Sequence, residues 1–219
     1  MRLPFALLMG VMALFDAWVA GFKISFKRLL YLAAVAGVAG CITQVVGVGQ
    51  GFWHYTGTQQ SYFFVPFTFV FTALCMYGLT TTWLERLLRP LTNYGPLWPN
   101  LLMVVVLFGL LLGTVPHSLG KLGTGFWIYY SFLFLFGLFV SFRMNFQTVL
   151  SMTISAWIVG GASETLGAQS GLWLYEGDTT SPPLFLVLAS WPLEFILHYS
   201  LSGLLAKEEL IARPSPRQS

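Results

Sequence analysis

Charged residues are scarce in this chain of 219 residues, because Asp, Glu, Lys and Arg together make up only 9% of it. Soluble globular proteins carry about 25% of such residues, so the composition excludes an ordinary soluble domain. Apolar residues account for 56% of the chain and aromatic residues for 17%, which is typical of an integral membrane protein. The net charge of +3 is too small to indicate a nucleic-acid partner.

Cysteine is also rare, and motifs for common cofactors are missing. Cys41 and Cys75 both lie in apolar runs, where small packing residues are expected rather than a disulfide or a metal site. The sequence contains no closely spaced cysteine pair, no His-x-x-x-His spacing and no Ser-His-Asp elbow. The glycine-rich segment 47–51 has no strand before it and no basic residue after it, so it is not a nucleotide loop. We therefore expect no metal and no other cofactor.

Seven apolar runs have about the length that a helix needs to cross a bilayer, roughly 17 to 25 residues. The runs are Leu3–Gly21, Leu29–Val48, Tyr62–Leu84, Leu101–Pro116, Phe126–Phe142, Thr148–Ala168 and Leu184–Ala206. The first lacks the basic start and the cleavage site of a signal peptide, so we expect a retained helix. The sequence predicts an all-α integral membrane fold of seven transmembrane helices. Because the fourth run is the shortest, six spans with a re-entrant fourth segment are the alternative.

The placement of basic residues between these runs predicts the orientation. One side carries Lys23, Lys27, Arg28, Arg86, Arg89, Arg143, Lys207, Arg213 and Arg217, and the other carries Arg2 and Lys121. Cytoplasmic loops are enriched in Lys and Arg, so we expect the N-terminus outside the cell membrane and the C-terminus in the cytoplasm. The acidic Glu176 and Asp178 would then face outward. Residues 207–219, polar and rich in proline, are expected to form a disordered cytoplasmic tail.

Two segments of the chain resemble each other at an offset of 120 residues. The matched pairs are Gln44 and Glu164, Gly47 and Gly167, Gly51 and Gly171, Trp53 and Trp173, Tyr55 and Tyr175, and Gly57 and Gly177. A further six-residue slip aligns Pro66 with Pro192. The pattern predicts one membrane domain, 1–206, built from two parallel three-helix repeats, 1–84 and 117–206, with a linker helix in 85–116. The alternative is that glycine and aromatic residues simply cluster at a membrane interface.

Ionisable residues inside apolar helices are costly to bury and are therefore candidate functional residues. There are four: Asp16, Glu164, Glu194 and His198. Glu194 and His198 are one helical turn apart, where a proton could be relayed between them. A purely structural hydrogen-bonded pair is the alternative. Because Glu194 stands near the middle of its helix, desolvation favours its neutral form, which suits a proton donor.

Aromatic residues accompany these acids and offer π faces that could stabilise a carbocation. We expect an elongated apolar pocket between the two repeats, with Gln44, Trp53, Glu164, Trp173, Trp191 and Glu194 on its walls. The further candidate substrate-binding residues are Tyr55, Trp157, Tyr175 and Asp16. For the Trp and Tyr residues of the two loops, an interfacial aromatic belt is an equal alternative.

The second half carries a recognisable pattern of acids and aromatic residues. Glu164 stands nine residues before Trp173 in a Gly-x-Trp-x-Tyr motif, and Pro192-Leu-Glu194 follows. This order resembles the membrane-bound lycopene cyclases of the heterodimeric bacterial and fused archaeal or fungal kind, in which a three-helix domain occurs twice. The family has a second glutamate where Phe195 stands here. The first half keeps neither acid, since Gln44 replaces one of them.

The resemblance implies proton-initiated cyclisation of an isoprenoid or carotenoid end group, with no net redox change and no cofactor. In that scheme Glu194 donates the proton and Glu164 is its partner or the final base. Carotenoid hydratases and seven-helix meroterpenoid cyclases have comparable designs. The alternative function is a non-catalytic membrane subunit or isoprenoid-binding protein, in an oligomer or a larger complex. A transporter is less favoured, because the helices contain few ionisable residues.

Overall fold

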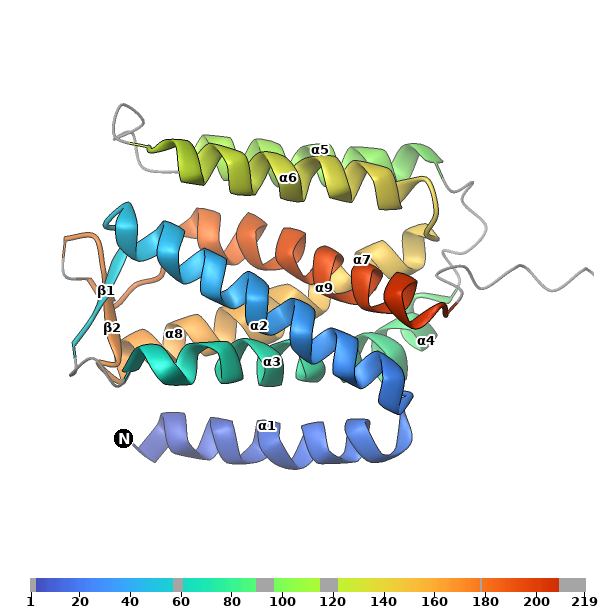
Figure 1. Ribbon diagram of the computed structural model, residues 1–219, viewed down its shortest axis with the longest axis horizontal. Helices are drawn as coiled ribbons and strands as arrows, with labels where there is room; N and C mark the ends of the chain where they lie inside the picture. Colours follow the sequence, from blue (N-terminus) through green and yellow to red (C-terminus); the bar gives the residue numbers. More distant parts are fainter. Residues whose placement is uncertain (1–2, 57–60, 90–96, 115–121, 178, 209–219) are drawn as a thin grey trace, which may run out of the picture.

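The chain is mostly helical in a computed structural model that describes residues 3–56, 61–89, 97–114, 122–177 and 179–208 (Figure 1). Within these ranges it forms seven helical rods. They are α1 (Leu3–Phe22); α2 (Phe26–Gly49); α3 (Ser61–Leu79) continued by η1 (Thr80–Leu84) and α4 (Glu85–Leu87); α5 (Leu97–Thr114); α6 (Thr124–Ser141); α7 (Phe146–Ser155) continued by η4 (Ala156–Gly160) and α8 (Gly161–Gln169); and η5 (Leu186–Ser190) continued by α9 (Trp191–Ala206).

Each rod overlaps one of the seven predicted runs, but several ends differ. The second helix begins at Phe26, three residues before the predicted start, because the Ser25 hydroxyl caps it by accepting a hydrogen bond from the Arg28 backbone N–H. Lys27 and Arg28 were expected in a connection and instead lie in the first turn of α2. The third rod likewise continues as α4, so Arg86 is helical as well.

Three rods contain a π-helical segment, which the sequence did not predict. These segments are η1, η4 and η5, and each is five residues long. In a π-helical turn the backbone hydrogen bonds span five residues instead of four, and such turns are often found at functional sites. Near η5 the Trp157 indole N–H donates to the Leu188 carbonyl oxygen at 3.0 Å, which satisfies a backbone group within the segment.

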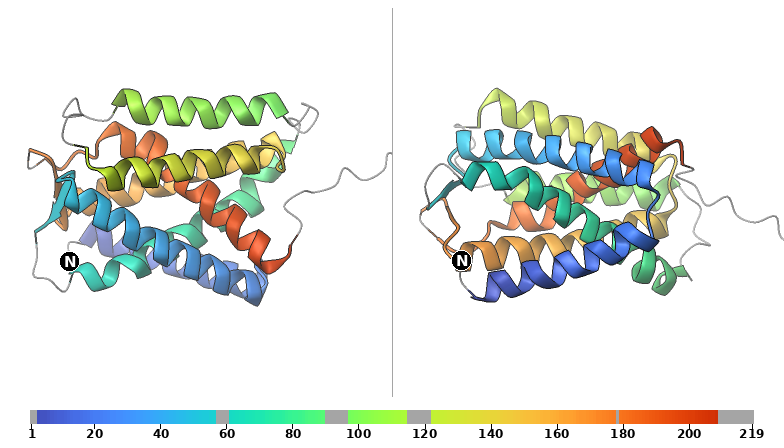
Figure 2. Two further views of the ribbon diagram at one scale, coloured as in Figure 1. Left: turned by 45° about the horizontal axis from the view of Figure 1, so that its top comes forward. Right: turned by 60° about the horizontal axis from the view of Figure 1, so that its bottom comes forward.

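Four rods form the centre of the bundle, and the others flank it. The central rods are α2, α3, the α7–α8 rod and α9 (Figure 1). On one side α1 packs mainly against α3, and on the opposite side α6 packs against α5 and α9. The two further views agree with this arrangement (Figure 2). The rods all run between the same two ends of the molecule.

A short two-stranded sheet closes one end of the helices. Strands β1 (Trp53–Tyr55) and β2 (Trp173–Tyr175) pair antiparallel, with Trp53 opposite Tyr175 and Tyr55 opposite Trp173. The fold is mostly helical, as expected, but the two segments expected to be loops form strands, because they supply each other's backbone hydrogen bonds. Strands of three residues are too short to be recognised by alternation in the sequence.

The helix ends that lead into the two strands have matching geometry. An ideal Cβ on Gly47 would lie 1.8 Å from the Trp53 ring, and one on Gly167 would lie 1.9 Å from the Trp173 ring. The next glycines, Gly51 and Gly171, have φ values of 74° and 70°, a left-handed conformation that favours glycine. The glycine and tryptophan spacings shared by the two segments thus have a steric cause.

A second pair of glycines, also 120 residues apart, packs against aromatic side chains. An ideal Cβ on Gly40 would lie 2.5 Å from the Phe69 side chain, and one on Gly160 would lie 2.6 Å from the Trp191 side chain. Phe69 and Trp191, 122 residues apart, thus make similar contacts with these glycines, whereas the predicted slip places Pro66 with Pro192 at an offset of 126 residues.

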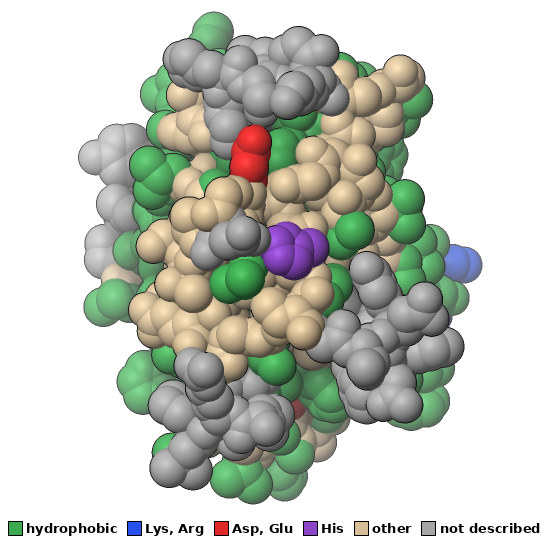
Figure 3. Space-filling model, turned by 90° about the vertical axis from the view of Figure 1, so that its left-hand side faces the viewer, with side chains coloured by type: hydrophobic (Ala, Val, Ile, Leu, Met, Phe, Trp, Pro, Cys, Tyr) green, Lys and Arg blue, Asp and Glu red, His purple; other side chains and the backbone are tan. Residues whose placement is uncertain are grey.

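Large apolar side chains are exposed along the outer faces of the bundle. On α1, for example, Leu7, Val11 and Leu14 are 60%, 66% and 76% exposed. Of the described helices, three are long and apolar enough to cross a membrane, Phe26–Gly49, Pro66–Leu87 and Thr124–Ser141; Leu7–Phe22 and Trp98–Thr114 are shorter apolar helices. Exposed apolar surface of this extent is typical of a membrane protein. Figure 3 shows the strand end, with apolar side chains gathered along its flanks.

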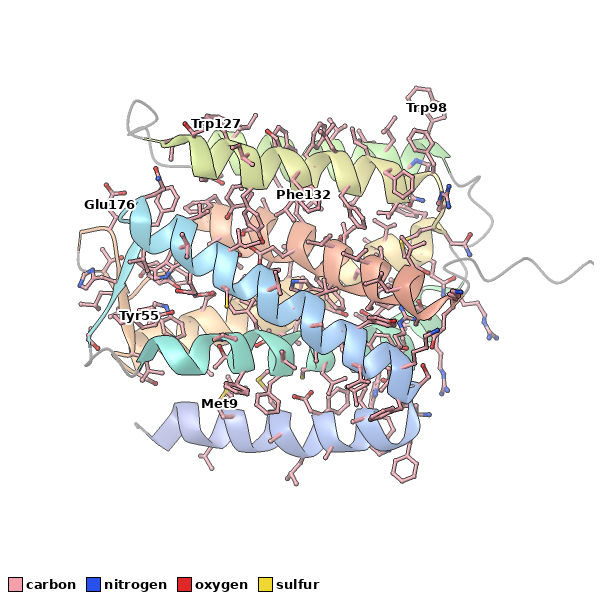
Figure 4. All side chains as sticks on the ribbon, in the orientation of Figure 1. Met9, Tyr55, Trp98, Trp127, Phe132 and Glu176 are labelled. Atoms are coloured by element: carbon pink, nitrogen blue, oxygen red, sulfur yellow. The ribbon has the colours of Figure 1, made fainter. Side chains whose placement is uncertain are left out.

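The two ends of the bundle differ in charge. The described basic residues belong to the helix ends and connections opposite the strands (Figure 1): Lys23, Lys27, Arg28, Arg86, Arg89, Arg143 and Lys207. Glu176 lies at the strand end (Figure 4). The other charged residues used to predict the orientation, Arg2, Lys121, Asp178 and those of the tail from residue 209, lie outside the described residues.

Candidate functional site

A cavity of about 480 Å³ lies among the central helices, next to the sheet. Residues from α1, α2, α3, α8, α9, η5 and both strands line it: Met9, Thr43, Gln44, Trp53, Tyr55, Thr68, Phe69, Thr72, Ser163, Glu164, Leu172, Trp173, Leu186, Ser190, Trp191 and Glu194. The six residues expected on the pocket walls are all among them, and so is Tyr55. The structure thus brings Glu164 and Glu194 to one cavity.

Aliphatic hydroxyls surround the Glu194 carboxyl. Its Oε1 accepts hydrogen bonds from Thr43 Oγ1 and Ser190 Oγ, both at 3.0 Å. The Thr43 hydroxyl also lies 2.9 Å from the Tyr129 hydroxyl, and the Ser190 hydroxyl lies 2.9 Å from the Tyr130 hydroxyl. The segment η5 ends at Ser190, one turn before Glu194, so both side chains project to the same side. Because hydroxyls donate or accept, this network can hold the carboxyl with or without its proton.

The Glu164 carboxyl has different neighbours, which only donate to it. Its Oε1 accepts a hydrogen bond from the Trp191 indole N–H at 3.0 Å, and its Oε2 accepts one from the Tyr175 hydroxyl. The Trp173 indole N–H in turn donates to the Tyr175 oxygen at 2.9 Å. Burial, and then the neighbouring Glu164 carboxylate, raise the pKa of Tyr175, so its hydroxyl stays protonated and donates. These hydrogen bonds stabilise the ionised form of the carboxyl, the form that can accept a proton.

Gln44 occupies the corresponding place in the first half of the chain. Its Oε1 accepts hydrogen bonds from the Trp53 indole N–H at 3.0 Å and from the Tyr55 hydroxyl at 2.6 Å. The partners are the same residue types that surround Glu164, but an amide oxygen does not act as a base near neutral pH. The cavity therefore has two carboxyls on its second-half side and an amide in place of a third.

Aromatic rings form much of the remaining wall. The rings of Phe69 and Trp191 are stacked, with centroids 5.1 Å apart and an angle of 23° between their planes. The rings of Tyr55 and Trp173 meet edge to face at 6.3 Å. Such faces carry the negative part of the ring quadrupole and attract cations. The walls can thus stabilise positive charge that develops on an apolar ligand.

Three of the expected substrate-binding residues do not line the cavity. Trp157 is 37% exposed on the outer surface, and its indole bonds to the Leu188 backbone. Asp16 is buried in α1, and its carboxyl oxygens have no hydrogen-bond partner among the described residues. Tyr175 lies behind Glu164, which it orients. For Asp16 and Trp157 the predicted helix was right, but the side to which the side chain turns was not predictable, and Tyr175 lies in strand β2.

The expected relay between Glu194 and His198 is also corrected. His198 is fully buried and does not line the cavity. Neither of its ring nitrogens has a hydrogen-bond partner among the described residues, so it does not bond to Glu194 directly. Spacing by one helical turn placed the two residues on one face without bringing their polar atoms together.

The sequence interpretation missed the hydroxyl residues that contact Glu194. Thr43, Tyr129 and Tyr130 have no motif around them, because single hydroxyls are common in apolar helices. Ser190 did carry a signal, since a serine four residues before a buried glutamate shares its helical face. Among the described residues, no group of three or more His, Cys, Asp or Glu side chains could hold a metal ion.

No protein-family model, no curated protein and no solved structure matches the chain. The resemblance to membrane lycopene cyclases therefore rests on the order and spacing of the acid and aromatic residues.

Proposed function

We propose that the chain is a seven-span protein of the cell membrane, with two parallel three-helix repeats around the central cavity. The matching helix ends at Gly47 and Gly167 support the duplication. The strand pairing supports it too, because Trp53 faces Tyr175 while Tyr55 faces Trp173, as a twofold rotation would require. In this arrangement the cavity lies on the axis that relates the repeats.

Within that cavity we propose acid–base cyclisation of an isoprenoid end group. The observation that carries the proposal is a pair of carboxyls with opposite surroundings in one aromatic cavity. Glu194 in its protonated form gives its proton to a terminal double bond, and an internal double bond closes the ring onto the resulting cation. Glu164 then removes a proton from the ring. The substrate gains one proton and loses one, so no oxidant or reductant is consumed.

The shape and chemistry of the cavity suit such a substrate. Its volume of about 480 Å³ lies in the range of about 300 to 1,000 Å³ typical of small-molecule sites. The stacked rings of Phe69 and Trp191 line the same cavity as Glu194, so a cation formed there meets an aromatic wall. Before the next turnover a proton must return to Glu194, and its hydroxyl network provides groups that can carry one.

Expression in a bacterium that makes lycopene tests the proposal. The wild-type chain should convert lycopene to a cyclic product. Chromatography would separate this product from lycopene, and its absorption maximum would lie at a shorter wavelength. The Glu194→Gln variant, expressed to the same level, should leave lycopene unchanged. If the wild-type chain converts neither lycopene nor its acyclic precursors, the cyclase proposal is wrong.

A second candidate function is binding of an isoprenoid without conversion. The observation that favours it is Gln44, because an amide in the acid's place shows that this hydrogen-bond pattern forms without a carboxylate. Both carboxyls could then be structural. Co-purification of unchanged lycopene with the wild-type chain, at the same level in Glu194→Gln, would favour this function.

A further inference from the structure

The two lateral walls of the cavity differ in how well they are sealed. On the side of α1, α3 and α8, the lining residues Met9, Thr68 and Ser163 are only half-buried. On the side of α2 and η5, Thr43 and Ser190 are 3% and 1% exposed, and the half-buried lining residue there, Gln44, is covered by its hydrogen bonds to Trp53 and Tyr55. The cavity is therefore more open towards α1 and α8.

Residues at matching places explain this difference. Tyr129 on α6 lies 120 residues after Met9 on α1. The Tyr129 hydroxyl is 2.9 Å from Thr43 Oγ1, and the side chain is 6% exposed, so it closes its side. Met9 is a thioether that makes no such bond. Its side chain lies between α1 and α3 (Figure 4) and lines the cavity. A methionine side chain is flexible and adapts to neighbouring groups.

The outer surface beyond Tyr129 confirms that its side is closed. An apolar groove of about 390 Å³ lies there on α2, α6 and α9, and it shares no lining residue with the cavity. Its lining residues are Ala34, Val35, Val38, Ala39, Ile42, Tyr129, Phe132, Leu197 and Leu201. The aromatic side chain of Tyr129 separates the two spaces.

The surface around Met9 is apolar. On α1, Leu7 and Val11 are 60% and 66% exposed, and Phe67 on α3 is 62% exposed. In addition, α1 packs mainly against α3 and touches α8 over a smaller area. A ligand that reaches the cavity from this side thus passes between two helices through hydrocarbon and not through water.

We propose that Met9, Thr68 and Ser163 form a lateral portal through which a linear isoprenoid chain passes from the bilayer into the cavity. The inference rests on the proposed function and names its substrate class. The reactive end of the chain passes through the apolar portal before it reaches Glu194. This end therefore carries no polar head group. The rest of the chain extends between α1 and α8 into the lipid, which allows a substrate longer than the cavity.

Thiol labelling tests the portal without any assumption about the reaction. The two native cysteines are replaced (Cys41→Ala, Cys75→Ala), because Cys41 is exposed. Single cysteines are then introduced at Met9 or Ser163, and the full-length variants in proteoliposomes are treated with N-pyrenyl maleimide, which partitions into the bilayer.

Matched variants at the sealed side provide the comparison. Thr43→Cys, 120 residues before Ser163, and Ser190→Cys are the sealed-side variants, and both keep the Tyr129 ring in place. Leu14→Cys, whose native side chain is 76% exposed, reports the labelling rate of an open site. We expect the labelling rates of Met9→Cys and Ser163→Cys, the portal pair, to lie within about tenfold of the rate of Leu14→Cys. The sealed pair should be labelled at least about tenfold more slowly than the portal pair, since buried groups react only through local opening. Equal protection of both pairs would overturn the portal.

A second experiment, which measures lycopene conversion by portal variants, separates this inference from the cyclase proposal. Met9→Trp should fill the portal and lower lycopene conversion at least about tenfold, since the bulky side chain overpacks the gap, whereas Leu14→Trp on the outer face should leave it unchanged. Conversion by Met9→Trp at the wild-type rate would refute lateral passage. If the wild-type chain converts nothing but the labelling pattern holds, the portal stands and the cyclisation fails.

Discussion

The two cavity carboxyls differ in the groups that bind them, and this difference suggests their roles. Glu194 is bound by two aliphatic hydroxyls, which can donate or accept, whereas Glu164 is bound by the Trp191 indole, which can only donate, and by the Tyr175 phenol. Hydrogen bonds to the charged form of a carboxyl stabilise that form. These contacts support the proposed assignment of Glu164 as the base and Glu194 as the proton donor.

Replacement of Glu194 by glutamine tests its role as the acid. Glutamine keeps the size and the hydrogen bonds to Thr43 and Ser190 but has no acidic proton. We expect conversion to fall by about 10²- to 10⁴-fold, the usual loss when general acid catalysis is removed, with near-normal thermal stability. The measurement is product formation per amount of folded protein.

Glu194→Leu is the structural control for this variant. It leaves the Thr43 and Ser190 hydroxyls without their shared partner, which should cost about 1 to 3 kcal/mol of unfolding free energy. If Glu194→Gln stays fully active while Glu194→Leu only loses stability, the carboxyl ties helices together and is not the acid.

The sequence was sufficient to find the ionisable and large aromatic members of the site. Glu164, Trp173 and Glu194 stand out, because charge is rare in apolar helices and Trp is rare in general. The hydroxyl partners of Glu194 could not be found in this way. Thr43 and Tyr129 meet only through tertiary packing, across a separation of 86 residues, and neither residue type is unusual in a membrane helix.

At the scale of elements, glycine sets how closely the helix ends approach the strands. Because an ideal Cβ on Gly47 or Gly167 would lie within 2 Å of an indole ring, either alanine variant must displace Trp53 or Trp173. Those rings line the cavity and hold Gln44 and Tyr175 by hydrogen bonds.

We expect Gly47→Ala and Gly167→Ala each to lower the unfolding free energy by about 1 to 3 kcal/mol, the usual cost of overpacking. Gly49→Ala is the matched control, since Gly49 is in the same helix as Gly47 and has no atom within 4 Å of its ideal Cβ. It should be neutral or stabilise by up to about 1 kcal/mol. Thermal unfolding followed by tryptophan fluorescence measures all three. Equal stability of all three variants would contradict the steric explanation.

A charged cluster joins the start of α2 to the end of α9. The Arg28 guanidinium donates to Glu208 at 2.8 Å and to the Tyr199 carbonyl oxygen at 3.2 Å. It also lies 4.9 Å and 4.6 Å from the ring centroids of Tyr77 and Tyr199, which are stacked on each other. Tyr199 thus serves this cluster and not the cavity.

This cluster makes stability depend on pH at acid values. Partial burial raises the pKa of Glu208, but hydrogen bonds from Ser25 and Arg28 and the Arg28 charge outweigh it, so the pKa lies below its usual range. The stabilising contribution is present above the unfolded value of about 4.3 and is lost as pH falls through the folded pKa.

Glu208→Gln should therefore lower the melting temperature at pH 7 and have little effect at pH 3. Because Glu208 is about one-third exposed, the difference at pH 7 should correspond to only about 0.2 to 1 kcal/mol. Melting curves of the wild-type and variant proteins in detergent at the two pH values measure it. A larger effect at pH 3 than at pH 7 would contradict the assigned role.

Helix number was predictable from the sequence because apolar runs of this length form helices in lipid. The helix ends were less predictable, because the Ser25 cap lets α2 begin earlier than expected and η1 continues into α4. The β1–β2 pair was not predictable, since it depends on two loops 120 residues apart meeting at one end of the bundle. The π-helical segments, one of which (η5) ends at Ser190, also have no sequence signal in apolar helices.

At the scale of the whole molecule, the paired strands constrain the topology. β1 and β2 contact each other, so residues 53–55 and 173–175 must lie on the same side of a bilayer. An even number of crossings must therefore separate them. Four rods lie between the strands, namely those that contain α3, α5, α6 and α8. A re-entrant α5 would leave three crossings and place the strands on opposite sides, so the pairing argues against the six-span alternative.

Reporter fusions test this topology directly. We expect alkaline phosphatase, which is active only outside the cytoplasm, to be active when fused after residue 56, 120 or 177, and green fluorescent protein to fluoresce when fused after residue 95, 143 or 208. The physical reason is the basic end at Lys23, Arg86, Arg143 and Lys207, which favours the cytoplasmic side. The fusion after residue 120 is decisive, because a re-entrant α5 would return that position to the cytoplasm and abolish phosphatase activity there. Inactive phosphatase at both 56 and 177, with activity at 143, would instead reverse the orientation while keeping the strands together.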